Sequence, residues 1–477
     1  MKHIEKLKAC TSLSSLAQLL GYKHAALAYL LYKLPSGSRY RHFQIPKKSG
    51  GVREIVAPQA QISALQSRVA ELLGNCLAEI DGDGVSPSHG FRKHRSTFTN
   101  AARHVGRRFV FNCDLKDFFP SIHFGRVKGF FLESQHFKLH PSVAHALANL
   151  VCFNGVLPQG APTSPVVSNL IGRILDFHLV KLARKNGLMY TRYADDLTFS
   201  TNKKSFPHEV GQDKGSDCWR VGSRLEKIIK QCGFSVNEQK TRMQYKTSRQ
   251  EVTGVVVNTK VSVPVEKRRW ARSAVHKLIT TGEYYRPPAK NFIGPHPEQP
   301  VAGSMRRLEG LLSYIYSSHR HCRKTFLSSQ NMVHRISTRD SALHSDEVVY
   351  QKFLHYAHFQ HGSSPLLMCE GKTDNVYIKT AMQRLAPAFP GLVDASNKVL
   401  VRFHSHSEVS GRILGLNGGT SDLKNALYCY FDRCRKDYKL KPSTPLVVVV
   451  DDDPAGKDVK GWAQGVAKKY GVVTPDF

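Results

Sequence analysis

Two adjacent carboxylates, Asp195 and Asp196, carry the first chemistry that this sequence offers. Apolar residues flank them over 190–193 and 197–199, which predicts two strands with the acidic pair at the tip of a hairpin. Adjacent carboxylates repel each other, and a divalent cation such as Mg²⁺, which prefers carboxylate and phosphate oxygens, removes that repulsion. An isolated Asp pair is also typical of a solvated turn, so the interpretation needs support from elsewhere in the chain.

Asp114 provides that support, because it ends a strand-like run over 108–114. A carboxylate at the end of a strand can face a hairpin tip across a sheet. Asp114, Asp195 and Asp196 would then hold two Mg²⁺ ions, one activating an attacking 3′-hydroxyl and the other steadying a leaving pyrophosphate. We therefore predict that these three residues are catalytic and bind the metal.

A second acidic group lies near the C-terminus. An apolar run over 366–369 ends in Glu370, and a β-branched run over 447–450 leads into Asp451 and Asp453. Continuous apolar runs of this kind are typical of parallel strands, whose carboxyl ends form the ligand-binding edge of α/β sheets. The alternative is an exposed acidic loop. We predict Glu370, Asp451 and Asp453 as further metal ligands.

Three potential zinc ligands, His319, His321 and Cys322, lie within one short stretch. A zinc site would need a second pair of ligands at suitable spacing, and none follows, so this stretch predicts no zinc site. The 10 cysteines are scattered without a Cys-x-x-Cys pair, which favours reduced thiols over disulfides.

The composition favours a folded protein that binds nucleic acid. The 477 residues allow two or three domains, and 41% of them are hydrophobic. The net charge of +32 is best explained by a phosphate backbone as partner. An anionic membrane is the rival partner, but no apolar run is long enough to span one. The first residues look unlike a signal peptide, so we expect a cytoplasmic protein.

The elements that must position the acids can be outlined from pattern alone. We expect a hairpin over 43–58, a helix over 61–80, a surface loop over 201–222 and basic helices over 265–341. A loop over 157–165 is punctuated by Pro and Gly. Its glycine would allow a nucleotide to approach the backbone closely.

The acidic hairpin, Asp114 and the intervening loop together resemble the palm of reverse transcriptases. The resemblance implies an α+β right-hand polymerase of fingers, palm and helical thumb. In it, Gln159 and Gly160 match the loop beneath the incoming nucleotide and template, and the sequence over 193–196 matches the family signature.

The same resemblance implies roles for nucleotide-binding residues. Phe119 would exclude a ribose 2′-hydroxyl, although a core aromatic is the simpler interpretation. Lys48 and Arg53 would grip the incoming triphosphate, although both could be solvated hairpin charges. Lys240 would protonate the leaving pyrophosphate.

Two short strings resemble elements of retron reverse transcriptases in particular. Asn100 and His104 match an Asn-Ala-x-x-His element, and Val252, Thr253 and Gly254 match a Val-Thr-Gly triplet. We predict that these five residues bind RNA. The resemblance implies a cognate noncoding RNA (msr-msd), priming from an internal guanosine 2′-hydroxyl, a branched RNA–DNA product made from dNTPs, and RNA removal by a host RNase H. An oligomer stays possible.

The second acidic group resembles the Toprim fold of topoisomerases, primases and some nucleases. There, Glu370 would act as general acid or base, and Asp451 and Asp453 would bind Mg²⁺. The Gly-Gly turn over 417–420 fits Toprim-bearing retron proteins, and that resemblance implies that the fused domain is the anti-phage nuclease effector. Such proteins usually continue beyond the point matched by Phe477, so we expect either an incomplete domain or a natural short form.

We therefore predict fingers and palm over 1–264, a thumb over 265–345, a linker over 346–364 and a small α/β Toprim-like domain with a parallel sheet over 365–477. Two alternatives stay open. The protein is a group II intron or diversity-generating type of reverse transcriptase, or it is an RNA–DNA-binding scaffold with an inert Toprim module.

Overall fold

The computed structural model describes residues 2–47, 51–82, 84, 86–215, 218–285, 301–329, 342–362, 364–436 and 445–469. The chain divides into two compact units, one spanning Met1–Ser262 and the other containing most of the chain from Val263 onward. The first unit contains the central acidic hairpin, and the second contains the C-terminal acidic residues.

The first unit opens with short helices that pack on a long one. Their bounds are α1 (His3–Lys8), α2 (Leu13–Leu19), α3 (His24–Ala28) and the long α4 (Ala60–Asp81). Strands β1 (Tyr40–Pro46) and β2 (Val52–Pro58) pair antiparallel, which confirms the predicted hairpin, and α4 confirms the predicted helix. Further helices are α5 (Thr97–Ala102), α6 (Phe124–Glu133) and α7 (Pro141–Val151).

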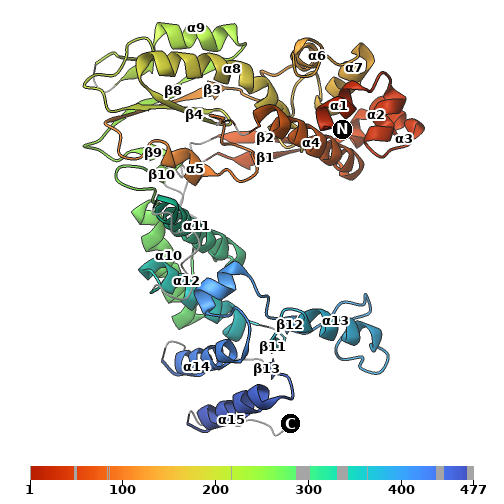
Figure 1. Ribbon diagram of the computed structural model, residues 1–477, viewed down its shortest axis with the longest axis vertical. Coiled ribbons are helices and arrows are strands. Elements are labelled where there is room, and N and C mark those ends of the chain that lie inside the picture. The colour runs from red at the N-terminus through yellow and green to blue at the C-terminus, as the bar shows by residue number, and fades with distance from the viewer. Residues whose placement is uncertain are drawn as a thin grey trace. The chain divides into compact units, whose positions relative to one another are not determined.

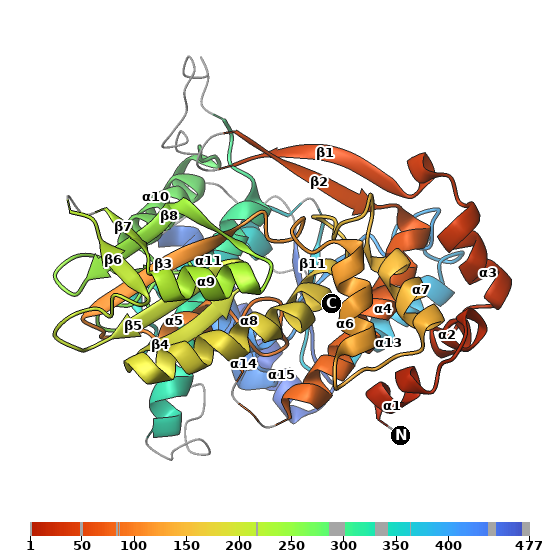
Figure 2. The same ribbon diagram turned by 90° about the horizontal axis from the view of Figure 1, so that it is seen from above.

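A four-stranded antiparallel sheet forms the centre of this unit, in the order β4-β5-β3-β8. Its strands are β4 (Met189–Tyr193), β5 (Asp196–Thr201), β3 (Phe109–Lys116) and β8 (Ser235–Tyr245). Helices α8 (Ser164–Asn186) and α9 (Ser223–Gln231) lie along one face of the sheet, as Figures 1 and 2 show. These two helices do not cover the opposite face of the sheet.

Side-chain alternation decides which residues face the helices. Phe111 pairs across the sheet with Phe199, and both side chains are fully buried. Because neighbours along a strand point to opposite faces, Asn112 and Asp114 of the same strand point away from that aromatic core. The sheet thus separates its apolar packing from the carboxylate that was predicted to be catalytic.

The stretch predicted as a surface loop contains a small hairpin of β6 (Gly211–Asp213) and β7 (Trp219–Val221). Trp219 packs 6.2 Å from the ring of Phe111, so one aromatic side chain ties this excursion to the core. A second short hairpin, β9 (Glu251–Val252) with β10 (Val255–Val256), follows β8. The loop prediction was therefore wrong for part of this stretch.

The second unit begins with helices α10 (Val265–Thr281), α11 (Met305–Ser329) and α12 (Ser345–His355). They bury Leu278, Leu308 and Phe353. Most of the segment 346–364, which we expected to be a linker, is α12 and the π-helical turn that follows it, packed on α10 and α11. Paired charges at the start of α12 explain the difference, because they anchor this segment to its neighbours.

The C-terminal part holds a parallel three-stranded sheet in the order β12-β11-β13, which confirms the predicted parallel sheet. The strands are β12 (Arg402–Phe403), β11 (Leu366–Cys369) and β13 (Leu446–Val449), with helices α13 (Asp374–Arg384), α14 (Thr420–Lys436) and α15 (Pro454–Lys469). Leu427 and Phe431 of α14 pack with Ala467 of α15. Among the described residues, none of the helices is both long enough and apolar enough to cross a bilayer.

Candidate active site

The predicted acidic hairpin is present, and it meets Asp114. Strand β4 ends at Tyr193, which pairs with Asp196, so Ala194 and Asp195 form the turn. Ala194 takes a left-handed φ of 57° to close it. Asp114 of β3 pairs across the sheet with Asp196, and the Leu115 amide donates to the Asp195 carbonyl at 3.0 Å. One edge of the sheet therefore carries all three carboxylates.

The three carboxylates repel one another, and nearby cations offset only part of that repulsion. Burial, followed by the charges of Asp195 and Asp114, raises the pKa of Asp196 to about 7. Burial and the neighbouring Asp114 also raise the pKa of Asp195, while Lys240 and Arg53 offset part of that rise. Lys240 Nζ lies 3.0 Å from both oxygens of Asp114. A protein cation thus already neutralises part of this cluster.

The donor atoms of the three carboxylates suit Mg²⁺. The donors are carboxylate oxygens, which Mg²⁺ prefers, and their mutual repulsion is the cost that a cation removes. The described residues hold one group of three side chains whose ligand atoms all lie within 4.8 Å, and it lies in the second unit rather than here. Metal binding at the palm thus fits the chemistry of Asp114, Asp195 and Asp196, and it stays a prediction.

A cavity of about 410 Å³ opens beside these carboxylates. Its lining combines acidic, basic and polar side chains with a tight turn, and it includes Thr97, Asn112, Asp114, Asp196, Lys240, Arg242, Thr253 and Gly254. Thr253 and Gly254 both have left-handed φ values, 50° and 74°, because they close the turn between β9 and β10. Two of the predicted RNA-binding residues therefore share a cavity with two of the predicted catalytic ones.

The other predicted RNA-binding residues lie inside the protein. Asn100 is 1% exposed and Val252 is fully buried. His104 is also buried, and its ring nitrogens bond to the hydroxyls of Ser200 and Thr191 at 2.7 Å each. Burial and nearby arginines lower the pKa of His104 to about 3, so it is neutral. Direct RNA contact stays a prediction for these residues, and the contacts of His104 favour a supporting role under β4 and β5.

The glycine predicted to face a nucleotide has a different close neighbour. Gly160 has a φ of 125°, and a Cβ there would lie 2.8 Å from Ile55 Cγ2. Beside it, the carbonyl of Gln159 accepts a hydrogen bond from the Val56 amide at 2.8 Å. The loop is therefore attached to strand β2, and the close approach that requires glycine is made by the protein itself.

The remaining candidates for nucleotide binding are Arg53, Phe119 and Lys48. Arg53 is exposed on β2, and its charge acts on Asp195. Phe119 is half-buried, with its ring 5.3 Å from Phe118 and 6.2 Å from Phe91. Lys48 lies outside the described residues. Arg53 and Phe119 are thus accessible on the same unit as the carboxylates.

The sequence is similar to those of reverse transcriptases. Residues 45–257 match the reverse transcriptase (RNA-dependent DNA polymerase) family. The chain is 38% identical over 244 residues to the retron Ec86 reverse transcriptase of Escherichia coli, an alignment covering 50% of this chain and 70% of that protein. The chain belongs to the retron reverse transcriptases.

A further retron relative, the Mx65 reverse transcriptase of Myxococcus xanthus, is 38% identical over 301 residues, or 58% of this chain. That alignment spans 61% of the relative's length, which is less than two thirds. A telomerase structure from Candida albicans, in complex with a telomeric RNA fragment, overlaps 67% of this chain and 64% of its own at a TM-score of 0.35 and 11% identity. That likeness is too slight to support an argument.

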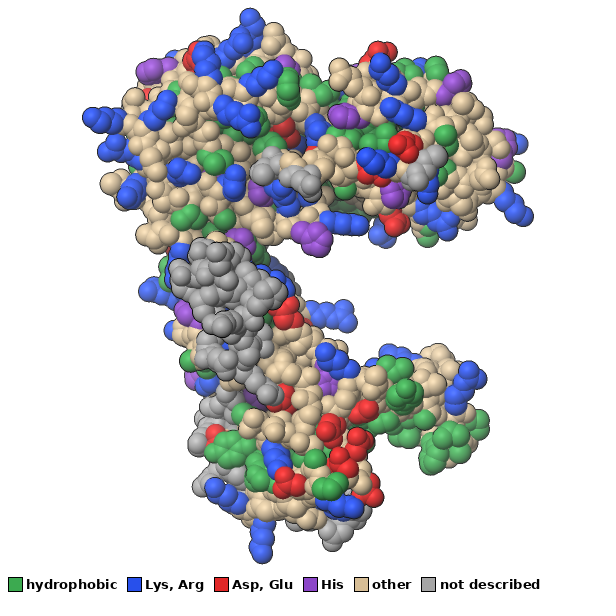
Figure 3. All heavy atoms as spheres, in the orientation of Figure 1, with side chains coloured by type: hydrophobic (Ala, Val, Ile, Leu, Met, Phe, Trp, Pro, Cys, Tyr) green, Lys and Arg blue, Asp and Glu red, His purple; other side chains and the backbone are tan. Residues whose placement is uncertain are grey.

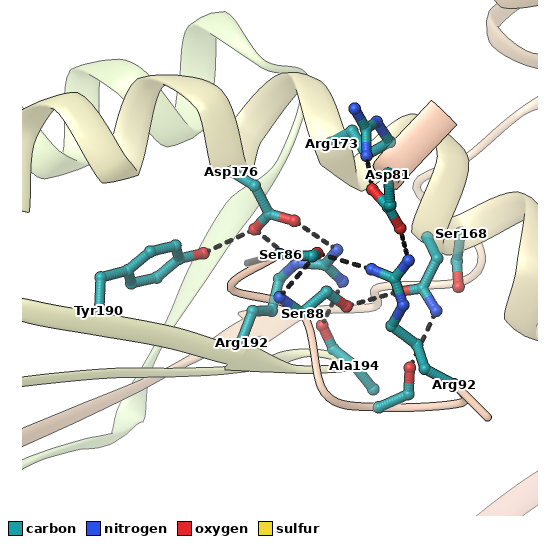
Figure 4. A network of polar contacts seen from close by, with 12 residues as sticks. Asp81, Ser86, Ser88, Arg92, Ser168, Arg173, Asp176, Tyr190, Arg192 and Ala194 are labelled. Atoms are coloured by element: carbon teal, nitrogen blue, oxygen red, sulfur yellow. Dashed lines mark hydrogen bonds and ion pairs between the residues drawn. The ribbon is translucent and has the colours of Figure 1, made fainter. Parts of the chain in front are cut away.

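The retron reverse transcriptase contains a buried ion pair, next to the turn that carries Asp195, that sequence reasoning missed (Figure 4). Arg192 is fully buried on β4, and its Nε and Nη2 donate to the two oxygens of Asp176 on α8 at 2.8 Å each. Its Nη1 donates to the carbonyl of Ala194 at 3.2 Å. The arginine thus ties helix α8 to the turn that presents Asp195.

The loop over 86–92 completes this support. Its backbone pairs with Arg192, because the His89 amide donates to the Arg192 carbonyl at 2.7 Å. A Cβ at Gly90 would lie 2.6 Å from the Ala194 nitrogen, so the loop passes directly against the turn. Asn169 of α8 donates to the Gly90 carbonyl at 2.9 Å. An arginine directly before the signature was the visible signal for this network, but its partner on another element was not.

The C-terminal acids are arranged more loosely. Glu370 and Asp451 follow adjacent parallel strands, and Glu370 Oε2 is buried with no hydrogen-bond partner among the described residues. The predicted Gly-Gly turn lies against this residue, since the Gly419 amide donates to the Glu370 carbonyl at 3.2 Å. Asp451 is exposed, and Asp453 Oδ1 accepts from the Gly456 amide at 2.7 Å at the start of α15. The acids share one sheet edge, but Asp453 is engaged as a helix cap.

Proposed function

We propose that this retron reverse transcriptase copies RNA into DNA at Asp114, Asp195 and Asp196. The single observation that carries the proposal is the cross-strand pairing of Asp114 with Asp196, with Asp195 in the adjoining turn. It joins carboxylates from distant parts of the chain at the rim of a polar cavity. The family match over residues 45–257 supports the same activity.

The residues divide the chemistry between them. Mg²⁺, held by the three carboxylates, would supply charge neutralisation at the transferring phosphate. Asp196 favours a bound proton and must release it to act as a ligand. Lys240 lies close enough to the acids to protonate a leaving pyrophosphate once it parts from Asp114. Arg53 is exposed and would bind the triphosphate through its guanidinium.

The cavity beside the carboxylates is the proposed seat of the priming nucleotide. Thr253 and Gly254 line it opposite Asp114 and Asp196, so a nucleotide there would present its hydroxyl to the acids. We assign to it the internal guanosine of a cognate msr-msd RNA, whose 2′-hydroxyl would start the branched product. The net charge of +32, with Lys and Arg spread over the face in Figure 3, supports an RNA partner.

A second candidate function concerns the C-terminal part. Its parallel sheet and the partnerless Glu370 oxygen support a Toprim-like, Mg²⁺-dependent nuclease acting in anti-phage defence. In this scheme the protein works in the bacterial cytoplasm, uses dNTPs, and leaves RNA removal to a host RNase H. The scaffold alternative predicts that defence survives the loss of Glu370 and Asp451.

Primer extension with Asp195→Asn tests the main proposal. We expect DNA synthesis on the copurifying RNA to fall below detection while RNA affinity stays within twofold of wild type. Sequencing of that RNA should show a branch guanosine. Normal extension by the variant would refute the metal assignment, and efficient extension of any annealed primer without the cognate RNA would favour the group II intron or diversity-generating alternative.

A further inference from the structure

Two histidines and a carboxylate of the second unit meet at the start of helix α12. His319 comes from α11, His344 directly precedes α12, and Asp346 lies in its first turn. One ligand atom from each lies within 4.8 Å of the others. His319 Nε2 is 3.1 Å and His344 Nδ1 is 3.8 Å from the same oxygen, Asp346 Oδ2.

These separations suit a single metal ion. Zinc binds imidazole nitrogen and carboxylate oxygen at about 2.0–2.2 Å, so tetrahedral ligands of one ion lie about 3.3 Å apart. The observed 3.1 Å and 3.8 Å bracket that value. The Asp346 side chain is 5% exposed, whereas His319 and His344 are 23% and 46% exposed, which leaves an open side for water. Two imidazoles and one carboxylate are a set that divalent transition metals accept.

A protein cation competes for the same oxygen. Arg268 Nη1 lies 3.2 Å from Asp346 Oδ2, and Arg272 Nη2 lies 3.7 Å from the other oxygen, Oδ1. His344 Nδ1 also accepts a long hydrogen bond, 3.3 Å, from the Asp346 amide. A metal would replace Arg268 and that hydrogen bond, while Arg272 could keep its oxygen. The positive end of α12 and the arginines both oppose a cation, so binding should be micromolar rather than tighter.

We propose that His319, His344 and Asp346 form a site for a divalent transition metal, with Zn²⁺ as the probe ion. The ion exchanges with Arg268 at Asp346 and links α11 to α12. The neighbouring Glu347 is already paired with Arg412 at 3.3 Å, so the first turn of α12 is anchored on its other side. The metal would therefore fix a helix junction and take no part in the polymerase site.

Zinc titration of the full-length protein tests this proposal. The protein is stripped of metal, held in excess Mg²⁺ to occupy hard-oxygen sites, and titrated with Zn²⁺ against a chromophoric chelator. His319→Ala and His344→Ala should each lower the affinity of one site at least about tenfold. His276→Ala, an exposed histidine on α10, is the matched control and should change nothing. Co²⁺ should give visible absorption bands that both test variants lose.

Arg268→Gln separates a metal site from a plain ion cluster. Removing the competing guanidinium should tighten Zn²⁺ binding severalfold if the metal uses Asp346 Oδ2. Equal Zn²⁺ affinity in wild type, His319→Ala and His344→Ala, or weaker binding by folded Arg268→Gln, would overturn the proposal. His344 is nearly half exposed, so its variant should fold by circular dichroism even if Arg268→Gln does not.

Discussion

The protein carries two sets of acidic residues, which differ in burial and in their neighbours. In the palm, pairing between β3 and β5 forces Asp114 against Asp196, and burial with neighbouring charge raises the pKa of Asp196 to about 7. In the C-terminal part, Asp451 lies exposed beyond its strand and Asp453 caps α15. The carboxylates of the first set repel one another, and a bound cation would relieve that repulsion. In the second set, one carboxylate, Asp453, already accepts a backbone hydrogen bond.

The difference shows that shared position at a sheet edge does not by itself make a metal site. Both sets follow strand ends, but the turn that carries Asp195 in the palm is also supported by the buried ion pair of Arg192 and Asp176. In the C-terminal set, Asp453 Oδ1 already accepts from the Gly456 amide, so a metal beside Glu370 would share that carboxylate with the backbone. We therefore expect changes in the palm to have the larger consequences for DNA synthesis.

The largest expected effect comes from exchanging single palm carboxylates for amides. Asp114→Asn should lower the rate of primer extension by at least about 10²-fold, because it removes charge stabilisation from the transferring phosphate. Single-turnover extension on the cognate RNA measures this. Glu370→Gln with Asp451→Asn is the matched control and should leave extension unchanged. Equal losses in both variants would show that the two acidic sets act as one.

The next effect concerns the buried support of the palm. Arg192→Gln leaves Asp176 buried without its ion pair, which should cost about 3–5 kcal/mol of unfolding free energy. In the fraction that folds at low temperature, we expect kcat to fall by a larger factor than KM for dNTP changes. The reason is that the turn carrying Asp195 is displaced, whereas Arg53 is not. Arg192→Lys should not rescue activity, since an ammonium lacks the planar fork with which Arg192 bonds Asp176 and the Ala194 carbonyl together.

Lys185→Gln is the control for this prediction, because Lys185 pairs with Glu209 at the surface, where ion pairs contribute about 0–1 kcal/mol. It should leave the melting temperature and kinetics close to wild type. A kcat for Arg192→Gln that matches wild type after correction for unfolded protein would leave Arg192 a role in stability alone.

The sequence predicted the acids of the palm because Asp195 and Asp196 lie between two strand-like runs and Asp114 ends a third. It could not predict the Arg192–Asp176 pair, whose members come from different elements and meet only after folding. The same limit applies to the proposed metal ligands. His319 was noticed, but His344 and Asp346 lie at the start of the next helix, so no local spacing could reveal them.

Burial had similar consequences for the RNA-binding predictions. A pattern match cannot tell an inward residue from an outward one, and so Asn100 and His104 were grouped with Thr253 and Gly254. The prediction of a linker over 346–364 was wrong because α12 is held in place by paired charges and by buried apolar side chains such as Phe353, and both kinds of contact form only after folding.

A smaller effect should appear in the pH dependence of stability. With chelator present, folded Asp196 keeps a proton up to about pH 7, whereas an unfolded Asp loses it near pH 3.9. Between these values the folded state binds more protons, so stability should fall as the pH rises, by at most about 4 kcal/mol. Thermal unfolding at successive pH values measures this slope.

Asp196→Asn should flatten that slope, and added Mg²⁺ should restore stability at high pH in wild type only. Asp451→Asn, from the C-terminal set, should keep the wild-type slope. A slope that survives in Asp196→Asn would assign it to another group and weaken the comparison between the two acidic sets.

The smallest effect comes from a glycine in each region. Gly160→Ala places a Cβ 2.8 Å from Ile55 Cγ2 at a φ of 125°, which should cost about 1–3 kcal/mol and raise KM for dNTP by loosening the loop from β2. Gly418→Ala has a comparable φ of 116°, but its Cβ would meet the Glu370 carbonyl at 3.3 Å. It should destabilise the protein without changing extension kinetics. If Gly418→Ala raised KM for dNTP as much as Gly160→Ala, the two regions would be coupled during synthesis, and the separation of roles argued from their acids would fail.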